Sequence, residues 1–159
     1  MTTTSDTTVR NAAAWYRAED PLRSAVDYVC ASSPTFNWVG VYLLQDDVLE
    51  LGPYVGAATE HTRIRVGVGV CGTAVARNAD MNVPDVTASD HYLACSVETR
   101  SELVVLIRDS TGAVVGQIDI DSHSPAAFGA PEERLVKDVA AELGARWADV
   151  LRTRKTHEP

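Results

Sequence analysis

The sequence of 159 residues is poor in basic residues and contains no long apolar run. Its 14 lysines and arginines face 22 acidic residues, and the formal net charge of −8 argues against nucleic acid or an anionic membrane surface as a partner. No apolar run approaches the roughly 20 residues of a membrane span. The N-terminus lacks the apolar segment of a secretory signal. We therefore expect a cytoplasmic protein that binds neither nucleic acid nor membrane.

Cysteine is also scarce, with three residues at positions 30, 71 and 95. An odd number does not suit a secreted fold that disulfides hold together. Cys30 lies on the apolar stripe of a helix predicted to begin at Asp20-Pro21, so we expect it to be a packed thiol. A disulfide between the other two cysteines would be transient and catalytic, because cytoplasmic thiols are kept reduced.

What the chain does have is enough apolar sequence for one core. Apolar residues make up 45% and charged residues 23%, which are ordinary values for a globular protein. We expect a single domain over residues 9–152, a disordered Thr/Ser-rich tail at 1–8 and a polar tail at 153–159.

The periodicity of the apolar residues predicts an α+β fold. Helices are expected at both ends of the chain, and short turns between strands, such as Gln45–Asp47, imply an antiparallel sheet. We expect helices at 9–18, 20–31 and 131–151, a short helix beginning near Cys71, and strands at 38–44, 48–53, 62–66, 82–86, 101–108 and 113–121. Residues 87–100 read as a long polar loop.

The residues suited to chemistry lie between Gly67 and Asp121. Cys71 follows two glycines at the start of a short helix, where unpaired N–H groups favour a thiolate. Cys95 lies in the polar loop before a strand. We interpret Cys95 and Cys71 as a redox pair that faces a small polar pocket.

Three acidic residues follow the cysteines. Asp119 and Asp121 share one face of a strand whose other face carries Ile118 and Ile120, a pattern that alone is typical of a solvent-exposed face. With Glu102 on a nearby strand, the three carboxylates could converge and bind an ammonium group. Their mutual repulsion would then raise at least one pKa, and Glu102 is the preferred proton donor.

Other interpretations of these residues remain open. Either cysteine could be an inert thiol, and Trp38 could be an ordinary core residue. A zinc site is also conceivable, although the spacings match no common zinc motif and we expect no metal. Its ligands would be His61, Cys71, His91 and Cys95.

Several motifs in this order resemble the free methionine-(R)-sulfoxide reductases, which are small stand-alone GAF domains. The resemblance runs from about Asn37 to Trp147. Its motifs are N-W-V-G-V-Y-L-L (37–44), R-I-R-V-G-V-G-V-C-G-T-A-V-A-R-N (63–78), H-Y-L-A-C-S (91–96), S-E-L-V-V (101–105) and G-Q-I-D-I-D-S (116–122). The chain departs from the family at His61, where another cysteine is frequent, and at Ser96, where aspartate is common.

The resemblance implies a GAF-like, six-stranded antiparallel sheet with helices packed mainly on one face, often in a homodimer. It implies that Cys95 is the nucleophile and Cys71 the resolving thiol. Trp38 and Tyr42 would contact the methyl sulfoxide end of the substrate. Glu102, Asp119 and Asp121 would handle its polar end.

The function implied is the reduction of free L-methionine-(R)-S-oxide to L-methionine, in repair of oxidative damage. Cys95 would become a sulfenic acid and then form a disulfide with Cys71. Thioredoxin, supplied with electrons from NADPH by thioredoxin reductase, would recycle that disulfide, and no cofactor would be bound. The alternative is a non-catalytic GAF domain that senses a small ligand, or a cysteine redox switch.

Overall fold

The computed structural model describes residues 14–88 and 97–157. The expected tail at 1–8 lies outside these residues, as do His91, Cys95 and Ser96. No helix within the described ranges combines the length and apolar character required to cross a membrane.

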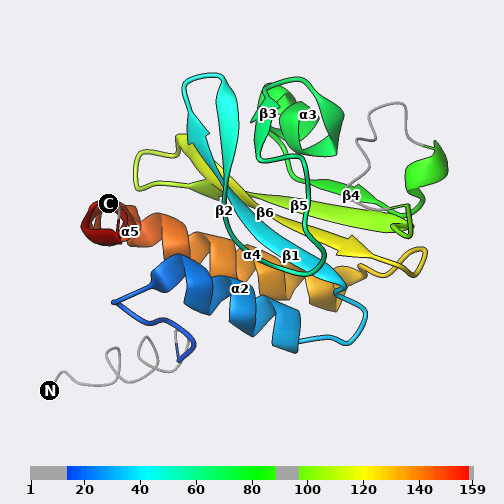
Figure 1. The fold of residues 1–159 in the computed structure, drawn as a ribbon, viewed down its shortest axis with the longest axis horizontal. Helices are drawn as coiled ribbons and strands as arrows, with labels where there is room; N and C mark the ends of the chain where they lie inside the picture. Colours follow the sequence, from blue (N-terminus) through cyan, green and yellow to red (C-terminus); the bar gives the residue numbers. More distant parts are fainter. Residues whose placement is uncertain (1–13, 89–96, 158–159) are drawn as a thin grey trace, which may run out of the picture.

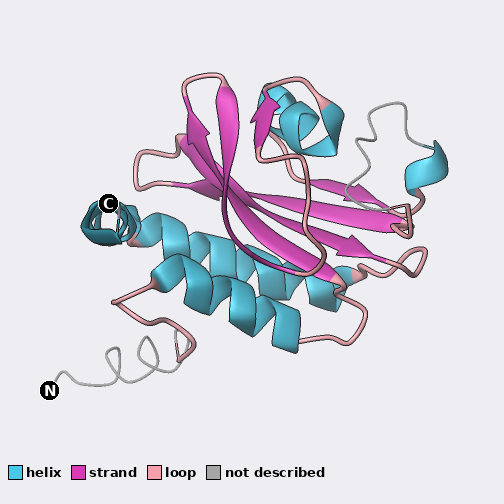
Figure 2. Ribbon diagram, in the orientation of Figure 1, coloured by secondary structure: helices cyan, strands magenta, loops and turns pink. Residues whose placement is uncertain are grey.

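One six-stranded sheet forms the centre of the fold, and every neighbouring pair of strands is antiparallel (Figures 1 and 2). The strand order is β3-β2-β1-β6-β5-β4. The strands are β1 (Trp38–Gln45), β2 (Val48–Val55), β3 (Arg63–Arg65), β4 (Met81–Val83), β5 (Ser101–Arg108) and β6 (Val114–Ser122). The predicted α+β class and the six-stranded antiparallel sheet are confirmed.

The helices lie mainly on one face of the sheet, as expected. Figure 1 shows α2 (Pro21–Ala31) and α4 (Ala130–Ala145) side by side beneath the sheet, with α5 (Trp147–His157) at the end of α4. The short α3 (Gly69–Arg77) covers part of the opposite face, and a 3₁₀ turn, η1 (Val86–Ala88), follows β4. Helix α2 begins as predicted: the Asp20 carboxylate accepts the Arg23 N–H, and Pro21 is the first helical residue.

Three expected elements differ from those observed. The C-terminal helix is divided at Arg146, and its second part, α5, includes most of the expected polar tail because Trp147 and Val150 turn back into the core. Residues 14–18 form turns and irregular backbone instead of the predicted helix. β4 ends before Pro84, which cannot donate a ladder hydrogen bond.

Two cores form, one on each face of the sheet. The larger core lies between the sheet and helices α2 and α4, and includes Ile118 and Ile120 of β6. Cys30 packs against this core, and burial raises the pKa of its thiol, in keeping with the packed thiol we expect. The smaller core lies beneath α3 and includes Trp38, Tyr42 and Cys71. The candidate site belongs to this second core.

Candidate active site

Five of the predicted site residues, Trp38, Tyr42, Glu102, Asp119 and Asp121, lie in three rows across the neighbouring strands β1, β6 and β5. Each row is a set of residues paired across the three strands. On the face that α3 covers, the first row is Trp38–Asp121–Glu102, the second is Gly40–Asp119–Val104, and the third is Tyr42–Gln117–Leu106. Antiparallel pairing thus brings together segments that are distant in the sequence.

The register of these strands places the three carboxylates together. Glu102 lies directly opposite Asp121, and Asp119 lies two residues from Asp121 on the same face of β6. The fractional exposure is 3% for Glu102, 0% for Asp119 and 1% for Asp121. A solvent-exposed face is therefore the wrong interpretation of the Asp119 and Asp121 pattern, because this side of the sheet is also covered.

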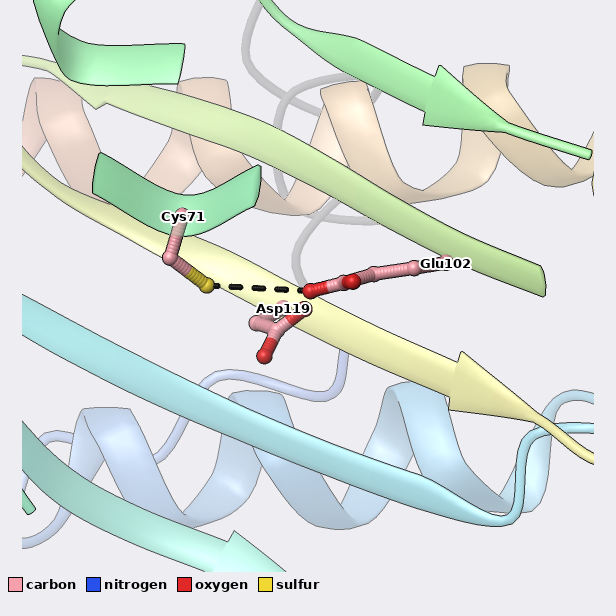
Figure 3. Close-up of side chains that lie close together, drawn as sticks. All are labelled: Cys71, Glu102 and Asp119. Atoms are coloured by element: carbon pink, nitrogen blue, oxygen red, sulfur yellow. Dashed lines mark hydrogen bonds between the residues drawn. The ribbon is translucent and has the colours of Figure 1, made fainter. Parts of the chain in front are cut away.

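Helix α3 brings Cys71 onto this acidic cluster. Gly67 and Gly69 have φ values of 93° and 66°, a backbone region that favours glycine, and they turn the chain from β3 into the helix. Cys71 lies in the first turn of α3, as the sequence predicts. Its Sγ atom is 3.8 Å from Oε1 of Glu102, and Figure 3 shows Asp119 beside this contact.

The cluster has one group that is well suited to hold a proton. Burial, followed by the charges of Asp119 and Asp121, raises the pKa of Glu102 well above its ordinary value. A hydrogen bond with Asp119 acts in the same direction. Burial also raises the pKa of Asp119, but its hydrogen bonds with Glu102 and Cys71 oppose this shift. We assign the proton of the hydrogen bond between Glu102 and Asp119 to Glu102, so that Asp119 is the acceptor.

Trp38 is held tightly at one end of the first row. Its indole Nε1 donates to the carbonyl oxygen of Ala57 at 3.1 Å, and its ring stacks on Tyr54 with centroids 5.5 Å apart. Gly40 and Gly56 leave room for the ring, since a Cβ atom at either position would collide with the indole. Trp38 is thus a core residue that also lies in line with two of the acidic residues.

Tyr42 is fully buried at one end of the third row. Its hydroxyl donates to the backbone carbonyl of His61 at 2.8 Å. His61 therefore anchors Tyr42 through its main chain, whatever its side chain contributes.

The zinc site that the sequence left open is not supported by the described residues. Two of its four ligands, His91 and Cys95, lie outside them. Within the described ranges, the group with ligand atoms close enough for one ion is Cys71, Glu102 and Asp119, all within 4.8 Å of one another, and it excludes His61. A cation there would compete with a proton on Glu102, whose pKa burial raises.

Two residues need separate mention: Cys95, which lies outside the described residues, and Gln117, which the sequence analysis did not single out. Because the structure does not describe Cys95, its pairing with Cys71 stays a prediction. Gln117 was missed, although it is fully buried on the same face of β6 as Asp119. The signal was available, because Gln117 precedes Asp119 by two residues in an alternating strand.

Comparison with known proteins identifies the family of this chain. The GAF domain family model matches residues 17–147. The chain is 40% identical over 109 residues to the free methionine-R-sulfoxide reductase of Escherichia coli (strain K12), covering 67% of this chain and 64% of that protein. The chain thus spans slightly less than two thirds of the length of this relative.

Two solved structures of free methionine-R-sulfoxide reductases are also similar. The type II enzyme of Thermoplasma acidophilum is 34% identical, with a TM-score of 0.76 over 87% of this chain and 93% of that one. The enzyme of Neisseria meningitidis, solved in complex with its substrate, is 29% identical, with a TM-score of 0.78 over 96% of each chain. The chain belongs to the GAF domain family and, within it, to the family of free methionine-(R)-sulfoxide reductases.

Proposed function

We propose that this protein reduces free L-methionine-(R)-S-oxide to L-methionine. The observation that carries the proposal is the 3.8 Å contact between the Cys71 thiol and the buried Glu102 carboxyl, in a chain of this family. A sulfoxide reductase needs a sulfur nucleophile, a proton for the departing oxygen and a second thiol. The cluster supplies the last two requirements from Glu102 and Cys71.

The first step transfers the sulfoxide oxygen to Cys95. The Cys95 thiolate attacks the substrate sulfur, and the oxygen passes to the cysteine sulfur with a proton from Glu102. The sulfur–oxygen bond of the substrate breaks as that of a sulfenic acid forms on Cys95. Methionine leaves, two electrons have moved to its sulfur, and Cys95 is oxidised by the same amount.

The second step closes a disulfide. The Cys71 sulfur attacks the sulfenic acid sulfur of Cys95, and the hydroxyl leaves as water after it takes a proton. Glu102, beside the Cys71 sulfur, is suited to move protons in this step as well. A dithiol reductant then reduces the disulfide by exchange, and we propose thioredoxin, supplied by NADPH through thioredoxin reductase.

Binding of the free amino acid follows from the buried acids. We assign the ammonium group of the substrate to the carboxylates of Asp119 and Asp121, and its methyl sulfoxide end to the aromatic rings of Trp38 and Tyr42. A methionine sulfoxide within a peptide lacks the free ammonium group. The protein should therefore leave peptide-bound sulfoxide unchanged.

A coupled assay tests the proposal. NADPH consumption should depend on thioredoxin and on the free R epimer, and should be absent with the S epimer or a blocked peptide. Cys95→Ser should lower turnover by at least about a thousandfold, since it removes the nucleophile. Cys71→Ser should release about one methionine per protein and then stop with a sulfenic acid that a dimedone reagent traps.

Two results would reject the proposal. Full activity in Cys95→Ser would show that the nucleophile is wrong. A wild-type protein that binds a small metabolite tightly but reduces neither epimer would instead favour the GAF sensor. Size-exclusion chromatography with light scattering tests the homodimer that we also propose.

A further inference from the structure

Gln117 is a buried amide whose hydrogen-bonding groups are not used by the other described residues. Its exposed fraction is 0%, and neither Oε1 nor Nε2 has a hydrogen-bond partner among the described residues. It lies in the third row, between Tyr42 and Leu106. It also shares its strand face with Asp119, two residues along β6.

Such an amide lowers the stability of the folded protein. A buried polar group without a partner loses its hydrogen bonds to water and gains none in return. The position does not demand an amide, because its neighbour Leu106 is apolar and also buried. Glutamine at this position therefore suggests a partner that the described chain does not supply.

The chemistry of the surrounding groups indicates which kind of partner this is. The first two rows lie on the same face as Gln117 and contain the acceptors Asp119 and Asp121. The indole N–H of Trp38 already donates to Ala57, and the hydroxyl of Tyr42 to His61. Among the described residues of the three rows, Gln117 is thus the one whose side-chain N–H donor has no acceptor.

We propose that Gln117 is a substrate-binding residue whose Nε2 donates a hydrogen bond to an oxygen of the bound amino acid sulfoxide. The substrate carries two kinds of acceptor oxygen, in its α-carboxylate and in its sulfoxide group. Asp119 and Asp121 serve its ammonium group, and Gln117 serves one of these oxygens. The inference rests on the proposed function and adds a donor to a site that is otherwise rich in acceptors.

Gln117→Met is the variant that tests this, because methionine keeps the length of the side chain and removes the amide. We expect its dissociation constant for methionine-(R)-sulfoxide to rise about three- to tenfold, as for one lost hydrogen bond. Its melting temperature should stay the same or rise, because an unpaired buried amide is removed. Gln117→Leu should behave alike. The control is Leu106→Met in the same row, with unchanged affinity.

A parallel titration with methionine identifies the oxygen. Methionine retains the α-carboxylate but lacks the sulfoxide oxygen. If Gln117→Met weakens both ligands equally, the amide binds the carboxylate; if it weakens the sulfoxide alone, the amide binds the sulfoxide oxygen.

Opposite results overturn the inference. A lower melting temperature with unchanged affinity in Gln117→Met would mean that the amide is bonded within the free protein, through a buried water for example. If the wild-type protein binds the sulfoxide without reducing it, the proposed reaction is wrong. The role of Gln117 would still be tested by the dissociation constants of the wild type and Gln117→Met. A wild-type protein that does not bind the sulfoxide would overturn both.

Discussion

The two faces of strand β6 are both buried from Gly116 to Ser122, but they differ in chemistry. On the face covered by α2 and α4, β6 contributes Ile118 and Ile120 to a hydrocarbon core. On the face covered by α3, the same strand contributes Gln117, Asp119 and Asp121, all at most 1% exposed. The first face stabilises the fold, whereas the second keeps polar groups out of water at a cost in stability. Burial alone therefore does not distinguish a core from a site.

Glu102→Gln, on the acidic face, should cause the largest loss of activity. Glutamine resembles the protonated carboxyl in shape but cannot give up a proton, so we expect kcat to fall by about a hundred- to ten-thousandfold. The coupled NADPH assay measures the loss. Glu102→Asp, which retains an acid, is the matched control and should keep more activity.

The same variant should be more stable than the wild type at neutral pH. Wild-type Glu102 keeps its proton when folded but loses it when unfolded above its ordinary value of 4.5. The folded state then binds more protons, so the free energy of unfolding falls as pH rises, by up to about 1.4 kcal/mol per pH unit, until the raised pKa is passed. Urea titrations between pH 5 and 8 should show a shallower fall in Glu102→Gln. An identical slope would contradict the assigned proton.

Leu143→Ala, on the opposite face, should lower stability but leave activity unchanged. Leu143 is fully buried in the core beneath α4, and its truncation should cost about 2–5 kcal/mol of unfolding free energy. Activity per folded molecule should be preserved, because the residue lies on the face opposite the acids. A large fall in kcat at full folding would show that the two faces are coupled.

Gly40→Ala should lower both stability and substrate binding, each to a smaller degree. The added methyl collides with the Trp38 indole, and relief of this overpacking should cost about 1–3 kcal/mol of stability. Displacement of the ring should raise KM more than it lowers kcat. Steady-state kinetics and tryptophan fluorescence measure the two effects, and an unmoved emission maximum with normal KM would contradict the role of the ring.

Asp20→Ala should have the smallest effect. It removes the N-cap of α2, on the face away from the acids, and should lower the free energy of unfolding by about 1 kcal/mol. KM and kcat should not change. Asp20→Asn, which can still cap the helix, should restore most of the stability.

Local signals allowed much of this fold to be predicted from the sequence. Asp20-Pro21 marks a helix start and Gln45–Asp47 a hairpin turn, because capping and turn geometry depend on adjacent residues. The alternation of residues 117–121 likewise separates two faces. It does not say that both faces are covered, since this depends on α3 returning across the sheet. The alternation also places Gln117 on the face of Asp119, but the burial of its side chain depends on distant segments.

The division between α4 and α5 was beyond local reasoning for a similar reason. The apolar stripe of α4 continues in the sequence through Trp147 and Val150. Only the packing of these two side chains shows that the helix is divided at Arg146. The resemblance to a known family supplied the roles of Cys95 and Cys71, which no periodicity contains.

The alternation of β6 has a consequence for how the chain finds its fold. A slip of one residue against β1 and β5 would turn Asp119 and Asp121 toward helices α2 and α4, and Ile118 and Ile120 toward the face that α3 covers. Such a misaligned hairpin would carry unpaired charge into hydrocarbon and could not compact. The two acids proposed to bind the substrate ammonium group thus also favour the native register of β6 during strand assembly.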